Sequence, residues 1–112
     1  MSVSETFFSL EVVDMERATA FWIAALGASV AFASPRWTSI FIARVRIGLF
    51  HQPESVGGRV GLHFVVDDLE RVCADVVRAG GSIVGPAMEV APGVVVADVR
   101  DTEGNVFALR RA

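Results

Sequence analysis

The segment GLHFVVDDLERVCADVVRAGGSIV, residues 61–84, has the pattern of a strand, a helix cap, a helix and a second strand in succession. Shifted back by 54 positions, it overlies residues 7–30, FFSLEVVDMERATAFWIAALGASV, and the two copies share their capping and turn residues. The pairs that match in character are Val12 with Val66, Asp14 with Asp68, Met15 with Leu69, Glu16 with Glu70, Arg17 with Arg71, and Gly27 with Gly81. The chain therefore contains an internal repeat, and the rest of the sequence is best interpreted as two copies of one unit.

Each copy opens a unit in which one strand and one helix are followed by further strands. In the first unit we expect a strand at 7–13, a helix at 15–26 and strands at 29–33, 37–43 and 45–51. In the second we expect a strand at 60–66, a helix at 69–79 and strands at 82–84, 88–90, 94–100 and 106–110. The last two strands are joined by Asp101-Thr102-Glu103-Gly104-Asn105, which fits a type I turn closed by Gly104 at positive φ. The pattern predicts an α+β fold of two βαβββ modules.

The length of 112 residues fits a single domain spanning residues 1–112. We place module one at 5–52, a polar, turn-forming linker at 53–59, and module two at 60–112. A module of about 55 residues buries too little surface to be more than marginally stable on its own. The two modules are therefore expected to share one core.

Composition excludes several classes of partner. A net charge of -3 without any basic run argues against nucleic acid. No apolar run approaches the roughly 18 residues that span a bilayer, and residues 1–6 lack the features of a signal peptide. A lone cysteine, Cys73, cannot form an internal disulfide, which agrees with a reducing compartment. We therefore expect a cytoplasmic protein with no membrane partner.

The apolar content predicts self-association. Hydrophobic residues make up 53% of the chain and the mean hydropathy is +0.51, which is high for so short a sequence. Part of that surface is expected to be buried between copies. We therefore predict a homodimer.

Three motifs, in order, resemble those of the vicinal oxygen chelate superfamily. They are Val12-Val13-Asp14 followed by Ala18 and Phe21-Trp22, Val66-Asp67-Asp68 before the second helix, and residues 101–105 before the last strand. That superfamily includes glyoxalase I, the extradiol dioxygenases, fosfomycin resistance enzymes and bleomycin resistance proteins. The resemblance covers nearly the whole chain, and it implies a curled mixed sheet that forms a cup.

The resemblance also implies where a metal would be held. In the metal-using members, four inward-facing side chains, histidine, glutamate or sometimes glutamine, bind a divalent cation. The matching positions here are Phe7, Gly48, Gly61 and Ala108, and none of these side chains can bind a metal. We therefore predict a protein without metal or other cofactor, similar to the bleomycin resistance branch, whose members are dimers with ligand crevices at the interface. A displaced metal set of His51, His63 and Glu89 is the weakest alternative.

Strand alternation selects the side chains that face the cup. Phe7, Ser9 and Glu11 should face away from the first helix, and so should Trp37, Ser39 and Phe41 if Thr38, Ile40 and Ile42 face it. We expect the ligand to be a small organic molecule, aromatic or apolar, that stacks on the aromatic side chains. The predicted ligand-binding set is Phe7, Ser9, Glu11, Trp37, Arg46, Phe50, Gly61, His63 and Ala108.

The role of His63 distinguishes two possible functions of the protein. His63 lies on the same strand face as Gly61, so it can line the pocket, act in proton transfer, or be a satisfied core imidazole. The favoured hypothesis is a metal-independent small-molecule binder. The alternative is a metal-independent enzyme of epimerase, cyclase or lyase type that uses His63 and Glu11 as its catalytic pair. His51 is expected to be exposed, and Cys73 to be a small core residue.

Overall fold

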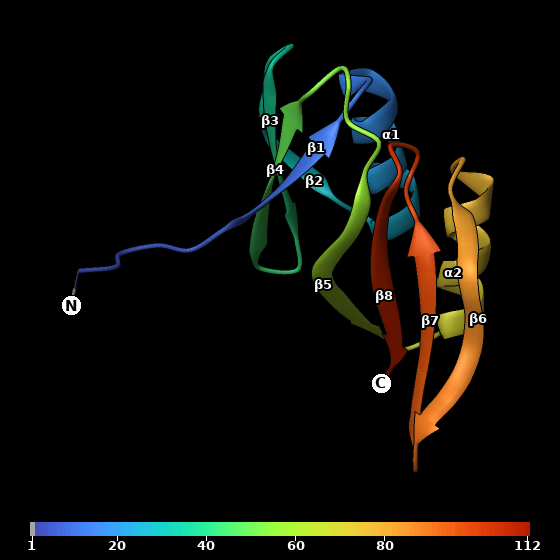
Figure 1. Cartoon of the computed structure of the whole chain (residues 1–112). Coiled ribbons are helices and arrows are strands. Elements are labelled where there is room, and N and C mark those ends of the chain that lie inside the picture. Colours follow the sequence, from blue (N-terminus) through green and yellow to red (C-terminus); the bar gives the residue numbers. More distant parts are fainter. Residues whose placement is uncertain (1) are drawn as a thin grey trace.

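The computed structural model describes residues 2–112 and contains two four-stranded sheets and two helices (Figure 1). The elements are β1 (Phe8–Val12), α1 (Met15–Leu26), β2 (Ser29–Ala33), β3 (Trp37–Ile42), β4 (Val45–His51), β5 (Gly58–Val66), α2 (Leu69–Arg78), β6 (Ser82–Ala91), β7 (Val94–Arg100) and β8 (Asn105–Arg111). The strand orders are β1-β4-β3-β2 and β5-β8-β7-β6. In each sheet the first strand pairs in parallel with the last, and the other pairs are antiparallel. The predicted α+β fold of two βαβββ modules is confirmed.

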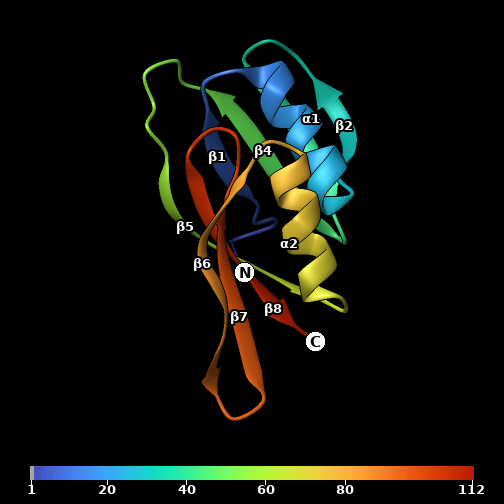
Figure 2. The same ribbon diagram turned by 90° about the vertical axis from the view of Figure 1, so that its right-hand side faces the viewer.

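Both helices begin and end where the sequence predicts, within a residue. The side chain of Asp14 accepts a hydrogen bond from the Arg17 backbone N–H at 3.0 Å, and Asp68 does the same for Arg71 at 3.1 Å. Gly27, at φ 69°, ends α1 in the left-handed conformation. The two helices pack against each other on one side of the sheets (Figure 2).

One core joins the two modules. The Trp22 side chain of α1 is fully buried, and its ring centroid lies 6.0 Å from that of Phe64 and 4.9 Å from that of Phe107, both in the second module. Nearly all of the buried apolar residues, from both sheets and both helices, form a single cluster. Because both sheets and both helices bury their apolar faces in this one cluster, neither module needs a core of its own.

The turn between β7 and β8 fastens the second module to the first helix. The Glu103 side chain is 0% exposed, and one of its oxygens accepts hydrogen bonds from the backbone N–H groups of Val13 at 2.9 Å and Asp14 at 2.8 Å. Its other oxygen accepts one from Arg17 Nε at 2.8 Å. Burial by itself raises the pKa of Glu103, but the hydrogen bonds from Arg17, Thr102 and the two backbone amides outweigh it and lower the pKa to about 2. We call this contact the Glu103 junction.

The turn itself is held by two more of its polar residues. Asp101 Oδ1 accepts hydrogen bonds from the backbone N–H groups of Glu103 and Asn105, both at 2.8 Å. Asn105 Nδ2 donates to the Glu11 carbonyl oxygen at 2.9 Å, so the turn also contacts β1. Burial raises the pKa of Asp101. These bonds fix the position of β8 relative to β1.

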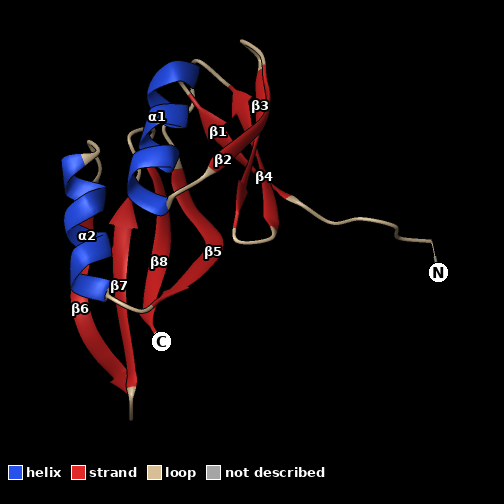
Figure 3. Cartoon of the chain, turned by 180° about the vertical axis from the view of Figure 1, so that it is seen from behind, coloured by secondary structure: helices blue, strands red, loops and turns tan. Residues whose placement is uncertain are grey.

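The side of each sheet that faces away from the helices carries no helix among the described residues, and we call it the open face. Leu10 and Val12 of β1 are buried on the helix side, whereas Phe7, which directly precedes β1 and alternates with them, is 43% exposed. The segment 2–7 runs outward from the first sheet (Figures 1 and 3). The open face of the first sheet therefore lies beside an extended N-terminal segment.

Two strand predictions need correction. The strands predicted at 82–84 and 88–90 are one strand, β6, whose pairing with β7 shifts register three times. Pro86 lies within it and is tolerated because β6 is at the edge of its sheet. The strand predicted to start at Val60 begins at Gly58. Within the described part of the chain, neither helix has the length and apolarity to cross a membrane.

Candidate ligand-binding site

The open face of the first sheet carries the side chains that alternation predicts. Thr38, Ile40 and Ile42 of β3 are at most 8% exposed and lie on the helix side. Trp37 and Phe41, which alternate with them, therefore lie on the open face with Phe7 and with Phe50 of β4. Phe41 and Phe50 are 36% and 38% exposed. Large aromatic side chains on this face are thus only partly covered.

Three of these rings form a cluster around Trp37, which we call the aromatic cluster: Phe7, Trp37 and Phe50. The ring centroids of Phe7 and Phe50 each lie 6.1 Å from that of Trp37, Phe7 edge-on and Phe50 tilted. Trp37 Nε1 donates to Ser39 Oγ at 2.9 Å. The indole lies over Gly48, where an added Cβ would come within 2.0 Å of the ring. Gly48 thus allows the indole to lie flat along the sheet.

A guanidinium group lies beside the aromatic cluster. Arg46 Cζ is 4.3 Å from the centroid of the Phe7 ring, and its Nη2 forms an ion pair with Glu5 at 2.8 Å. The Glu5 side chain is 60% exposed, so that ion pair is open to water. Arg46 Nε is buried and has no hydrogen-bond acceptor among the described residues. The cluster therefore has an unused donor at its edge.

The open face of the second sheet is more polar. The register places His63, Ala108 and Asp98 side by side on β5, β8 and β7. Arg59 Nη2 forms an ion pair with Asp98 Oδ2 at 3.0 Å, and the hydrogen bond that Arg59 donates to Asp98 raises the pKa of Arg59. Gly61 has open space where a Cβ would be, whereas Ala108 is only 3% exposed. The Arg59–Asp98 pair was not predicted from the sequence, although the period-two spacing of Arg59 with Gly61 and His63 could have indicated Arg59.

The proposed catalytic pair does not form a contact. The Glu11 carboxylate accepts a hydrogen bond from Ser55 Oγ at 2.9 Å and lines a small hollow of about 170 Å³. His63 is exposed and lines a different hollow, of about 590 Å³, with Phe8 and Val45 of the first module. Within residues 2–112 no hydrogen bond or ion pair joins Glu11 to His63. The hypothesis of a Glu11–His63 pair gains no support from this geometry.

The four positions that would hold a metal do not fit one. Phe7, Gly48, Gly61 and Ala108 carry no donor atom in their side chains, and Trp37 covers Gly48. No three His, Cys, Asp or Glu side chains gather at a metal-binding distance in the described part of the chain. The displaced set is not assembled either: His51 lies on the helix side of the first sheet, and Glu89 accepts a hydrogen bond from the Gly93 N–H at 2.9 Å.

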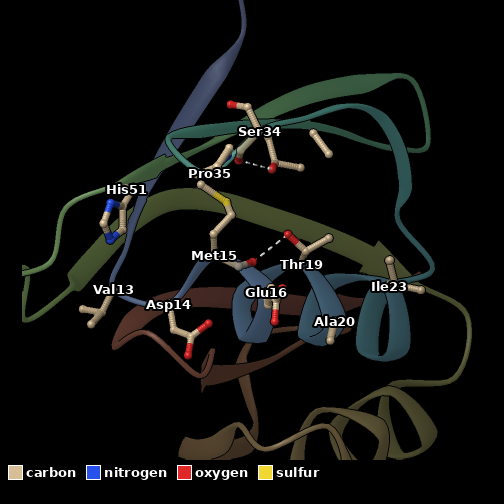
Figure 4. Close-up of a pocket in the computed structure, with 12 residues that line it drawn as sticks. Val13, Asp14, Met15, Glu16, Thr19, Ala20, Ile23, Ser34, Pro35 and His51 are labelled. Atoms are coloured by element: carbon tan, nitrogen blue, oxygen red, sulfur yellow. Dashed lines mark hydrogen bonds between the residues drawn. The ribbon is translucent and has the colours of Figure 1, made fainter.

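A further cavity lies on the helix side of the first sheet, away from the open face (Figure 4). It is a groove of about 760 Å³ between α1 and the loop that joins β2 to β3. His51, which we expected to be exposed, is half-buried and lines this groove. Cys73 is half-buried, and burial raises the pKa of its thiol, which suits a packing residue better than a nucleophile.

Known structures resemble this one over nearly their whole length. The chain is similar to hypothetical protein SA1046 from S. aureus, with a TM-score of 0.83, 21% identity, and coverage of 100% of this chain and 96% of that one. It is similar to a glyoxalase/bleomycin resistance protein/dioxygenase family enzyme from Burkholderia phytofirmans PsJN, with a TM-score of 0.81, 20% identity, and coverage of 94% and 95%. It is also similar to a variant of the fosfomycin resistance protein FosX from Listeria monocytogenes in complex with Mn(II) and dihydroxypropylphosphonic acid, with a TM-score of 0.81, 18% identity, and coverage of 97% and 90%.

No curated protein sequence matches the chain. The glyoxalase-like domain family, by contrast, matches residues 7–110, which is nearly the full length. The paired βαβββ modules agree with that match, as do the structural neighbours in the glyoxalase/bleomycin resistance/dioxygenase superfamily. The chain therefore belongs to the glyoxalase-like domain family, and its fold is the one predicted from the resemblance to the vicinal oxygen chelate superfamily.

Proposed function

We propose that this protein binds a flat aromatic acid on the open face of the first sheet, without a metal and as a homodimer. The observation that carries the proposal is the aromatic cluster, whose rings are partly exposed on a face without a covering helix. A flat ring stacked on Trp37 would gain both apolar burial and aromatic contact. Metal chemistry is not part of the proposal, because the four metal positions have no donor side chains.

The proposal that the ligand carries an acidic group rests on Arg46. Its Nε lacks an acceptor, and its Nη2 is held only by the exposed Glu5. A carboxylate that displaced Glu5 would accept hydrogen bonds from both nitrogens, which is the bidentate arrangement that guanidinium groups favour. The same guanidinium already lies over the Phe7 ring, so the acid would sit at the edge of the aromatic cluster. We therefore prefer an aromatic acid to a neutral aromatic ligand.

The test is a calorimetric titration with 2-naphthoate as the probe. Trp37→Leu is expected to weaken its binding by about tenfold or more, because the stacking surface is lost. Arg46→Gln should weaken it by a similar factor, because the charge-assisted hydrogen bonds are lost. Arg44→Gln is the matched control, since Arg44 lies in the turn just before β4, and it should bind within twofold of wild type. Equal affinity in wild type and Trp37→Leu would refute the proposal.

His63 separates binding from catalysis in the same titration. Because Glu11 is engaged by Ser55 and lines another hollow, no observation favours the epimerase, cyclase or lyase alternative. His63→Ala is expected to lower affinity by at most about tenfold, with no product formed by either variant. Turnover that falls roughly 100-fold in His63→Ala would favour the enzyme instead.

We also predict a homodimer in solution. Phe7, Phe32, Phe41 and Phe50 are 36–58% exposed, more large apolar side chains than an isolated open face would leave in water. Association through this face should bury on the order of 1,000 Å² or more. Light scattering should therefore give twice the mass of 12.0 kDa at micromolar concentration. A monomer mass under those conditions would contradict the prediction.

A further inference from the structure

We propose that the groove behind the first sheet is a second binding site, and that it takes a small molecule with an apolar body and a protonated amine. This site is separate from the proposed aromatic-acid site. Thr38, which lines the groove, and Trp37, which lies in the aromatic cluster, are consecutive residues of β3 and point to opposite faces of the sheet. The two sites would therefore be filled independently.

The groove has apolar walls. Met15, Ala20 and Ile23 of α1 form one wall, and Ala33 and Pro35 form part of the other (Figure 4). Ile23 is 46% exposed although it is a large aliphatic side chain. The volume of about 760 Å³ is in the range of small-molecule sites. An apolar body of two fused rings would therefore find contact on both sides.

The hydroxyl groups in the walls of the groove already form hydrogen bonds with the protein backbone. Thr19 Oγ1 donates to the Met15 carbonyl oxygen at 2.8 Å. Ser34 Oγ donates to the Trp37 carbonyl oxygen at 2.7 Å and accepts from the Trp37 N–H at 3.0 Å. These side chains therefore offer a ligand little hydrogen bonding. The selectivity of the groove has to come from shape and from charge at its rim.

The charge at the rim is negative. Asp14 and Glu16 line the groove at the start of α1, and no arginine lines it. The chain has no lysine, and within residues 2–112 neither Asp14 nor Glu16 forms an ion pair. The nearest arginine along the helix, Arg17, is bound to Glu103.

This charge excludes an anion and favours a cation. The N-terminal end of a helix ordinarily attracts anions, but here two carboxylates already lie at this end. Asp14 accepts a hydrogen bond from the Arg17 backbone N–H, and Glu103 accepts two from the N–H groups of Val13 and Asp14 just before the helix. Because Arg17 neutralises Glu103, the excess of negative charge at this end of the groove comes from Asp14 and Glu16. A protonated amine would complement that charge, while its apolar part lay between Ile23 and Pro35.

The groove is a property of the first module and not of the repeated fold. α2 packs on β6, β7 and β8, whereas the main contacts of α1 are with β3, β4 and α2. The strand that corresponds to β6 in the first module is β2, and all five of its residues are exposed. Because α1 packs on β3 and β4 and not extensively on β2, space remains beside β2 and the loop that follows.

The repeat supplies matched control variants. Glu16 and Ala20 correspond to Glu70 and Ala74 of α2, and all four residues are exposed. Glu70 forms only a surface ion pair with Arg111. A change at position 16 or 20 can therefore be compared with the same change on the other helix, at a similar cost in stability.

The experiment is an amide NMR titration with 2-naphthylmethylammonium, its neutral isostere 2-naphthalenemethanol, and 2-naphthoate. We expect the ammonium probe to shift the signals of Thr19, Ala20, Ile23 and Ser34 saturably. Glu16→Gln should weaken that binding by about threefold, because one exposed carboxylate is lost. Ala20→Met should weaken it by tenfold or more, because the longer side chain fills the groove. Glu70→Gln and Ala74→Met should stay within twofold of wild type.

Each contrary result overturns a defined part of the inference. Equal binding of the neutral alcohol would overturn the assignment of an amine. Saturable shifts around Phe50 and His63 instead of Thr19 and Ser34 would place the cation on the open face and overturn the second site. Unsaturated shifts up to millimolar ammonium probe would also overturn it. None of these outcomes depends on whether 2-naphthoate binds the aromatic cluster, so the two proposals fail separately.

Discussion

Replacement of Glu103 by glutamine is expected to lower the free energy of unfolding by about 3 kcal/mol. The buried carboxylate accepts hydrogen bonds from Arg17 and from the backbone N–H groups of Val13 and Asp14. A neutral amide cannot present two anionic oxygens to these donors, so at least one buried donor loses its partner. Urea denaturation of both proteins measures the difference. Glu54→Gln removes an exposed carboxylate in the linker and should change stability by less than about 0.5 kcal/mol.

The pH dependence of stability gives a second readout of this junction. The pKa of Glu103 falls from 4.5 to about 2 on folding, so its stabilising contribution is present above the unfolded value and is lost as pH falls toward the folded value. The raised pKa of Asp101 acts in the opposite sense, since its protonation favours the folded state. We expect wild type to lose stability from about pH 5 to pH 2, and Glu103→Gln to lose less. Parallel pH profiles would show that Glu103 does not couple protonation to folding.

Gly104→Val is expected to cost about 3 kcal/mol, the upper end of the range for a strained backbone position. The structure confirms the positive φ predicted for this turn, at 91°. In addition, a Cβ at this position would lie 2.6 Å from the Val56 carbonyl oxygen. The substitution therefore combines backbone strain with a clash against the linker between the modules.

Gly93→Val separates these two contributions. Gly93 also has a positive φ, 75°, but nothing lies within 4 Å of where its Cβ would be. It should cost only about 1 kcal/mol, which reflects the backbone alone. Denaturant titration of both variants gives the comparison. Equal losses of unfolding free energy in the two variants would mean that the clash with the linker does not contribute to the cost of Gly104→Val.

Most of the fold could be predicted because its signals are local. The caps at Asp14 and Asp68 and the alternation of buried and exposed residues along β3 depend on neighbours within a few positions. The 82–91 region was predicted wrongly as two strands because Gly85 and Pro86 are ordinarily breakers. In an edge strand a shifted register accommodates them, and whether a strand is at an edge cannot be read from its own residues.

The candidate site was less predictable because its decisive contacts join distant residues. Alternation placed Trp37 on the correct face, but it could not show that the indole lies over Gly48 or that Arg46 lies over Phe7. Nor could it show that Ser55 holds Glu11. The groove was missed because it depends on which strands α1 packs against, and the periodicity of the helix does not indicate that.

The Glu103 junction also constrains the order in which the protein can mature on the ribosome. The residues it joins, Val13 and Glu103, are separated by 90 positions. The first helix is therefore synthesised long before the Glu103 carboxylate that binds its amino-terminal end. Until Glu103 has been added, two backbone N–H groups and one guanidinium of the first module lack their native hydrogen-bond acceptor. Native packing of this half is thus a late event, set by translation of the second half rather than by the first module's own sequence.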